Sequence, residues 1–264
     1  MLLAVKERLP HSLLITGFLG AGLTTAARDI AGKQLAAIIE PTDREGNVDL
    51  SSKGVIRAQQ IRELSKYAAA KTTKRRVFII DQADQMNKTS QNAFLKLLEE
   101  PVPGTHLILT AHAAHKLLPT VRSRVQAITL DPLTAEQSAL LLTRLRVLEP
   151  TARQQMLFLA EGKPAELTRL ATSSAYFEQV GGYTRDARMF LRGTPSEQLS
   201  ILEQYQANRA QTLLLLDAAI RIIRHSLRQA PNDELLTKAD ALAVAYDRIT
   251  ANGNIRLQLT NLLF

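Results

Sequence analysis

The sequence predicts an α/β domain with a mainly parallel sheet, followed by a region built of helices alone. Short apolar runs alternate with helical patterns from residue 12 to about residue 130, an order typical of parallel strands joined by helical crossovers. Beyond Pro132 no run is typical of a strand, and apolar residues recur at helical spacing. A chain of 264 residues fits two domains or three small ones, at about 100–200 residues per domain.

Five apolar runs in the first half have the length of strands. They lack the polar alternation that marks a half-exposed strand, so we expect both of their faces to be buried. The runs cover residues 13–16, 35–39, 77–81, 107–110 and 127–130. Between them, helical patterns cover residues 24–32, 56–70 and 88–99, and Pro101 ends the third.

The second half contains a series of helical patterns separated by proline, glycine or asparagine. The patterns cover residues 134–147, 151–161, 165–180, 183–191, 195–206, 209–229, 233–251 and 254–263. One break is expected at Gly181 and Gly182, because glycine weakens a helix. Residues 213–227 are apolar on more than one face, which predicts a helix at the centre of a bundle.

The residue counts exclude several kinds of protein. The chain has no cysteine, which rules out disulfides, zinc ribbons, iron–sulfur clusters and thiol catalysis. No run approaches the roughly 20 apolar residues that cross a bilayer, so we expect no membrane partner and a cytoplasmic location. The spacing of His106, His112 and His115 does not suit a metal site on a helix, so no metal is expected.

The charge of the chain is compatible with a phosphate-bearing partner. There are 33 lysines and arginines against 25 acidic residues, a net charge of +8, and such an excess attracts nucleotides or nucleic acid. The densest basic run, Lys71 with residues 74–76, directly precedes a predicted strand. We interpret this run as a solvated loop in preference to a DNA contact. With 7 Phe, 5 Tyr and no Trp, a platform for stacking bases is not expected.

A glycine-rich turn follows the first predicted strand and opens a helix. Its spacing fits the phosphate loop G-x-x-x-x-G-K-[ST], in which backbone N–H groups and a helix N-terminus surround phosphates. Gly17, Gly22 and Thr24 occupy fixed positions of this pattern, and Gly20 lies within the loop between them. The lysine of the pattern is replaced by Leu23, which has neither a charge nor a donor. Thr24 could bind magnesium only together with a nucleotide.

A second element of a nucleotide site is the acid that ends the third predicted strand. An apolar run leads to Asp81, as in the magnesium-holding strand of P-loop NTPases. Gln82 follows where an ATPase with a D-E-x-D motif has the glutamate that activates water, and an amide cannot accept that proton. The pocket therefore lacks both the phosphate-binding cation and the general base. For Asp81 and Asp84 we prefer structural roles, a strand-end cap and a helix N-terminal charge, over magnesium binding.

Several segments resemble motifs of the AAA+ clamp-loader family. Residues 81–87 (DQADQMN) and 91–101 (QNAFLKLLEEP) are similar to its D-E-A-D-x-M and Q-N-A-L-L-K-x-L-E-E-P motifs. Residues 117–125 (LLPTVRSRV) resemble L-L-P-T-I-R-S-R-C, and residues 252–259 resemble the N-x-N-P-R-L-x-L ending of the collar domain. The resemblance implies three parts, which are a AAA+ nucleotide-binding-like domain at 1–132, a small helical lid at 133–172 and a helical collar for oligomerisation at 173–264.

Within this family the chain is most similar to the delta-prime type, whose nucleotide site is degenerate. Leu23 and Gln82 depart from the ATPase pattern, and Ala111 and Ala165 stand near the positions of its two sensors. Related subunits often carry a four-cysteine zinc module between the two nucleotide motifs, and this chain has no cysteine. We therefore expect no cofactor, neither ATP nor zinc.

The resemblance implies a subunit that hydrolyses no ATP itself and helps to load a sliding clamp onto primed DNA. Its partners would be gamma/tau-type ATPase and delta subunits, with the clamp and the DNA bound through the complex. Arg124 would act as an arginine finger on ATP in a neighbouring subunit, because a guanidinium stays charged and forks onto phosphate oxygens. Ser123 and Thr120 would position it, and Arg122 is a weaker candidate at the same interface.

Two other functions stay open at this point. One is an active gamma/tau-type ATPase in which another cation replaces the missing lysine. The other is a free-standing nucleic-acid-binding protein with a AAA+-like fold, which only the net charge favours. The structural alternative for Arg124 is a surface arginine that pairs with a nearby carboxylate.

Overall fold

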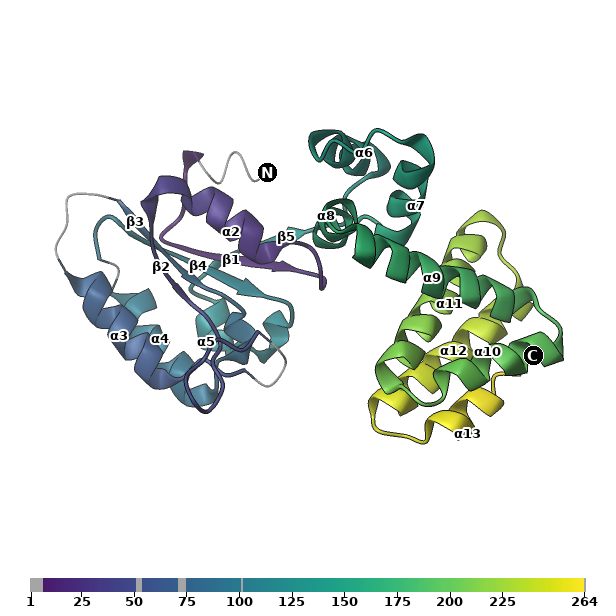
Figure 1. The fold of residues 1–264 in the computed structure, drawn as a ribbon. Coiled ribbons are helices and arrows are strands. Elements are labelled where there is room, and N and C mark those ends of the chain that lie inside the picture. The colour runs from purple at the N-terminus through teal and green to yellow at the C-terminus, as the bar shows by residue number, and fades with distance from the viewer. Residues whose placement is uncertain (1–6, 51–53, 71–74, 101, 264) are drawn as a thin grey trace. The chain divides into compact units, whose positions relative to one another are not determined.

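The computed structural model describes residues 7–50, 54–70, 75–100 and 102–263. The chain divides into two compact units, residues 1–168 and 169–264. The first unit is an α/β structure and the second is made of helices alone, so the predicted fold class is confirmed (Figure 1). The three parts that the resemblance implies stay a prediction.

The first unit is built on a sheet of five parallel strands in the order β2-β3-β4-β1-β5. The strands are β1 (Ser12–Gly17), β2 (Leu35–Ile39), β3 (Arg76–Ile80), β4 (Thr105–Ala111) and β5 (Gln126–Leu130). The four residues after Arg76 in β3 are fully buried, which explains the missing alternation there. The expectation of two buried faces is wrong for the edge strands, because β2 is half-buried and β5 is mostly exposed.

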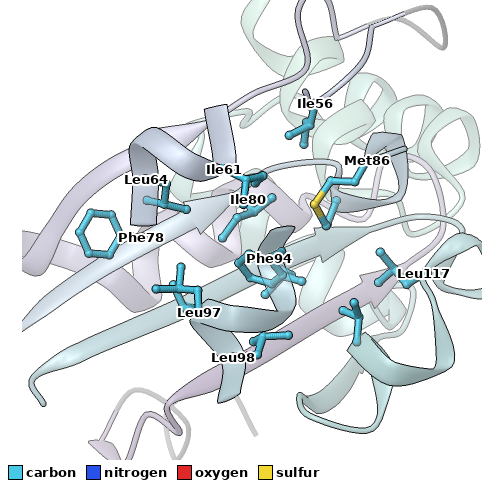
Figure 2. Packing of buried hydrophobic residues seen from close by; sticks show 14 of the residues in the cluster. Ile56, Ile61, Leu64, Phe78, Ile80, Met86, Phe94, Leu97, Leu98 and Leu117 are labelled. Atoms are coloured by element: carbon cyan, nitrogen blue, oxygen red, sulfur yellow. The ribbon is translucent and has the colours of Figure 1, made fainter. Parts of the chain in front are cut away.

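Helices cover both faces of the sheet. One face packs against α2 (Leu23–Ala31) through side chains such as Leu13 and Ile15. The other face packs against α3 (Ala58–Ala69), α4 (Lys88–Glu99) and α5 (Pro119–Arg122). In Figure 2, Phe94 of α4 lies close to Ile80 of β3 in this second core. Successive strand residues therefore belong to different layers, as the pleat of a strand requires.

Three helices follow the sheet, α6 (Ala135–Arg144), α7 (Pro150–Ala160) and α8 (Pro164–Thr172). The division between the two units falls within α8, after Thr168. In the part of the chain that the structure describes, no helix has the length and apolar character needed to span a bilayer.

The second unit is a bundle of α9 (Ser174–Arg192), α10 (Pro195–Tyr205), α11 (Arg209–Gln229), α12 (Asp233–Thr250) and α13 (Ile255–Thr260). Helix α11 packs against both α9 and α12. It buries Thr212, Leu215, Leu216, Ala218, Ala219 and Ile223. The prediction of a central helix at this place is therefore confirmed.

Helix α9 runs without interruption through Gly181 and Gly182, where we expected a break. The new helix begins after Ser173 instead, whose side chain accepts a hydrogen bond from the Tyr176 backbone N–H at 3.3 Å. Glycine costs a helix interior about 1 kcal/mol relative to alanine. Packing outweighs that cost here, because α9 buries residues on both sides of the pair, namely Val180, Thr184, Ala187 and Phe190.

Arg76, the last residue of the basic run, lies in β3 and is held by hydrogen bonds, so the expectation of a solvated loop is wrong for this residue. The Arg76 guanidinium donates to the carbonyl oxygens of Tyr67, Ala68 and Ala70, at 3.2, 2.9 and 2.7 Å. These carbonyls belong to the C-terminal end of α3, where a helix leaves acceptors without an intrahelical partner. Arg76 thus caps α3, while residues 71–74 lie outside the described part of the chain.

Candidate functional site

The glycine loop joins β1 to α2 at the carboxyl edge of the sheet. Gly20 and Gly22 have φ angles of 89° and 75°, in the left-handed region that favours glycine. The Ala21 backbone N–H donates to the Phe18 carbonyl oxygen at 3.1 Å and closes a turn. The turn leads into the N-terminus of α2, where a helix attracts anions. In its backbone, the loop therefore has the features expected of a phosphate loop.

Leu23, the side chain at the lysine position of the pattern, is part of the hydrophobic core. Leu23 is 3% exposed and belongs to the same buried cluster as Leu13, Ile15 and Ile30. A methyl group added at Gly17 would lie 3.1 Å from the Cδ2 atom of Leu23, so this side chain packs directly against the start of the loop. The site offers an apolar surface where phosphate-loop ATPases place a cation on the β- and γ-phosphates, and in this respect it does not fit ATP and magnesium.

Asp81, Thr24 and Thr110 form one hydrogen-bonded group beside the loop. Asp81 is 2% exposed, and its Oδ1 atom accepts the Thr24 hydroxyl at 2.8 Å and the Thr110 hydroxyl at 2.6 Å. A buried carboxylate is costly without such partners. In an NTPase, the threonine hydroxyl and the carboxylate at these two positions would hold magnesium together. Here the Thr24 hydroxyl donates to the Asp81 carboxylate. The group ties the start of α2 to the ends of β3 and β4.

The two residues that follow Asp81 with polar side chains are also held by structural contacts. Gln82 has a left-handed backbone (φ 51°), its N–H donates to the Thr110 hydroxyl at 2.9 Å, and its Nε2 atom donates to the Leu50 carbonyl at 3.3 Å. The Oδ2 atom of Asp84 accepts the backbone N–H of Ala113 at 3.1 Å. Asp84 therefore joins the turn after β3 to the turn after β4, and the Gln82 amide provides no base.

The turn that begins α8 packs onto the glycine loop. The Ala165 backbone N–H donates to the Gly20 carbonyl oxygen at 3.2 Å. A Cβ atom at Gly20 would lie 3.6 Å from that of Lys163, and one at Gly22 would lie 3.7 Å from the Pro164 ring. The loop is therefore covered by a neighbouring segment of the same unit.

Arg124 lies two residues after the end of α5, on the surface of the first unit. Its Nη1 atom donates to the Thr120 carbonyl at 3.0 Å and to the Ser123 hydroxyl at 3.3 Å. Its Nη2 atom pairs with the Oε1 atom of Glu99 at 2.9 Å. The side chains of Arg124 and Glu99 are 39% and 51% exposed. The structure thus brings together Thr120, Ser123 and Arg124, and it also gives Arg124 the carboxylate partner that the structural alternative for this residue expects.

Gln91 connects the segment before Arg124 to α4. This side chain is 2% exposed. Its Nε2 atom donates to the carbonyl oxygens of Met86 and Lys116 at 3.0 and 3.1 Å, and its Oε1 atom accepts the Leu118 N–H at 2.6 Å. A buried amide with three partners is well satisfied and holds its neighbours firmly. It fixes the start of α5 against α4.

Sequence reasoning missed Thr110, Gln91 and Glu99 as members of this region. Thr110 could have been found, because it is a polar residue in an apolar run. Successive residues of a strand face opposite layers, and Ala111 packs into the core of one layer, so its neighbour Thr110 faces the other side, where it meets Asp81. Gln91 and Glu99 lie in the quoted motif, but nothing in their spacing indicates their contacts with residues 116, 118 and 124.

A parallel sheet in this order, with a glycine loop after β1 and an acid after β3, defines a P-loop domain of the AAA+ class. The family model described as "DNA polymerase III, delta subunit" matches residues 3–134, half of the chain. The chain belongs to this family.

Similar proteins agree with this assignment. The chain is 36% identical over 118 residues to the DNA polymerase III subunit delta' of Pseudomonas aeruginosa, across 44% of this chain and 36% of that protein. It is 25% identical over 240 residues to the DNA polymerase III subunit gamma/tau of Mycobacterium tuberculosis, across 82% of this chain and 36% of that protein. The chain thus spans about a third of the length of these relatives.

Solved structures show the same fold. A DNA polymerase III gamma subunit-related protein from Thermotoga maritima superposes with a TM-score of 0.56 at 20% identity, covering 99% of this chain and 97% of that chain. The RuvB Holliday junction branch migration motor of the same organism gives 0.51 at 18% identity, covering 84% and 73%. At these identities the likeness establishes the fold alone.

Proposed function

We propose that this chain is a delta-prime-like subunit of a DNA polymerase III clamp loader that hydrolyses no ATP itself. The burial of Leu23 carries the proposal, because an apolar side chain packed into the core replaces the cation that a phosphate-loop ATPase needs. Gln82 supports it, since an amide replaces the general base. Both changes remove chemistry and keep the fold.

The partners in this proposal are gamma/tau-type ATPase and delta subunits, with the sliding clamp and primed DNA bound through the complex. The AAA+ domain would be residues 1–132, the lid residues 133–172 and the oligomerising collar residues 173–264. The second unit has its own hydrophobic core around α11, which suits a separate assembly domain. Work on chromosomal DNA would place the protein in the cytoplasm.

The active contribution of the chain would be Arg124, offered to ATP that a neighbouring subunit binds. The guanidinium lies on the surface and is 39% exposed. Thr120 and Ser123 hold one side of it through its Nη1 atom. An arginine finger supplied by a second protein accelerates hydrolysis by about 10³–10⁵ in GTPases, so loss of a finger is readily measured.

The test is ATP hydrolysis by the chain alone and by the complex reconstituted with its ATPase and delta subunits, the clamp and primed DNA. We expect no turnover by the chain alone and stimulated turnover by the complex. Arg124→Ala should leave assembly intact and slow that turnover at least ten-fold. Arg122→Ala, the matched removal of a neighbouring exposed arginine, should have a much smaller effect.

Each other outcome points to a different function. ATP binding and turnover by the isolated chain would overturn the proposal in favour of an active gamma/tau-type ATPase. Salt-sensitive DNA binding by the chain, without assembly with any clamp-loader subunit, would favour a free-standing nucleic-acid-binding protein. Equal rates for the wild type and Arg124→Ala would remove the finger from the proposal.

A further inference from the structure

The Arg124 guanidinium is held by acceptors of its own chain on both of its terminal nitrogens. Nη1 donates to the Thr120 carbonyl and the Ser123 hydroxyl, at 3.0 and 3.3 Å, and Nη2 pairs with Glu99 at 2.9 Å. A guanidinium has five N–H groups in a planar fork. Among the described residues these contacts use three of them, so the Nε hydrogen and one Nη2 hydrogen are left to donate to a ligand.

Glu99 is placed on a rigid element. It is the last residue of α4, and the preceding turn is anchored in the core by Phe94, Leu97 and Leu98. Gln91 lies eight residues earlier in the same helix, about 12 Å along its axis at 1.5 Å per residue. Gln91 fastens the chain at Leu118 and Glu99 fastens it at Arg124. The segment that presents the arginine is therefore attached to α4 at both of its ends.

We propose that Glu99 is a positioning residue for Arg124, and that its carboxylate fixes the orientation of the guanidinium before a neighbouring subunit presents ATP. This inference rests on the finger role proposed above. A free arginine side chain samples many rotamers, and holding it in advance lowers the entropy lost when its remaining N–H groups meet a phosphate. Because Glu99 touches Arg124 and no reacting atom, it acts only through the arginine.

The contact is exposed on both sides, so its effect is modest in size. For Glu99→Ala we expect kcat for ATP hydrolysis by the complex to fall two- to five-fold, which equals about 0.4–1 kcal/mol at 1.36 kcal/mol per tenfold. KM for ATP should stay unchanged, since the arginine acts in the transition state. Glu99→Gln keeps an oxygen acceptor and should retain most of the wild-type kcat. Glu100→Ala removes the adjacent carboxylate and should have no effect.

The experiment measures steady-state hydrolysis by the reconstituted complex with clamp and primed DNA, and it includes the double variant Glu99→Ala/Arg124→Ala. If Glu99 acts through the arginine, the double variant is no slower than Arg124→Ala alone. A further slowing in the double variant, or wild-type kcat in Glu99→Ala, would overturn the inference. A faster Glu99→Ala complex would also overturn it, because the carboxylate would then restrain the finger.

Failure of this inference can be told apart from failure of the proposed function. If Arg124→Ala slows hydrolysis while Glu99→Ala does not, the finger stands and only the positioning role is lost. If neither change slows hydrolysis, the finger itself is lost. Thermal unfolding of Glu99→Ala completes the set, since an exposed residue at a helix end should leave the melting temperature within about 1–2 °C of the wild type.

Discussion

Leu23→Ala tests whether the lysine position of the glycine loop has become part of the core. Leu23 is 3% exposed and packs with Leu13, Ile15 and Ile30. Leucine-to-alanine changes at buried sites cost about 2–5 kcal/mol, depending on how far the surroundings collapse. Leu23 lies in the first turn of α2, next to a loop that can move inward, so we expect a loss of about 2–3 kcal/mol in the unfolding free energy of the first unit.

Differential scanning calorimetry of the chain measures this change and separates the transitions of the two units. At about 2–4 °C per kcal/mol for a unit of 150–250 residues, the melting temperature should fall by roughly 4–12 °C. Leu19→Ala is the matched control, because Leu19 lies in the same loop and is 79% exposed. That control should change stability by less than about 0.5 kcal/mol.

The rate of ATP hydrolysis completes this test. At a temperature well below the transition, the complex with Leu23→Ala should hydrolyse ATP at the wild-type rate, since Leu23 offers no chemical group. Equal melting temperatures for Leu23→Ala and Leu19→Ala would refute the reasoning. The side chain would then lie outside the core, and the loop would be open to a phosphate.

Two further predictions concern other parts of the chain. Alanine at both Gly181 and Gly182 should raise the unfolding free energy of the second unit by about 1–2 kcal/mol, because each glycine costs a helix roughly 0.5–1 kcal/mol and an added Cβ would meet no atom closer than 3.9 Å. An unchanged melting temperature would show that α9 is not helical there. Burial lowers the pKa of His106 from its usual 6.5, and the charges of Arg75 and His11 add to this effect. The folded state then binds fewer protons than the unfolded state. The stability that depends on a neutral His106 is therefore fully present above about pH 6.5 and is lost as the pH falls through the lowered pKa. His106→Gln should flatten the dependence of the melting temperature on pH between about 5 and 7, and identical profiles would contradict the assignment.

The central strands were predictable because burial on both faces leaves a direct trace in the sequence. In β3 all four residues from Val77 to Ile80 are buried, so the run is continuously apolar. The edge strands β2 and β5 were found by the same signal, yet one lies half-buried and the other mostly in solvent. A short apolar run does not say how many strands flank it, because pairing is decided by distant parts of the chain.

Local propensity failed where packing decided the outcome. Glycines at 181 and 182 indicated a break, but buried residues on both sides keep α9 continuous. The charge of Arg76 indicated solvent, but its guanidinium caps a helix that ends several residues earlier. In both cases the missing information was the position of a partner that no periodicity encodes.

The candidate site was predictable at the level of motifs and not at the level of contacts. The glycine pattern and the acid after β3 placed Thr24 and Asp81 in one pocket. In the structure the Thr24 hydroxyl lies 2.8 Å from the Oδ1 atom of Asp81, although the two residues are 57 positions apart in the sequence. The pairing of Glu99 with Arg124 followed from no pattern, because it depends on where α4 ends relative to α5.

The two left-handed glycines of the loop after β1 are explained by the backbone conformation of the turn, without reference to a bound phosphate. Gly20 and Gly22 are favoured by their left-handed backbone angles, whether or not a phosphate binds. Selection for the turn alone is therefore enough to preserve the signature in a descendant that has stopped consuming nucleotide. A survey of genomes that scores glycine spacing alone would not separate such descendants from working ATPases, whereas the residue just before the threonine shows whether the lysine of the pattern is present.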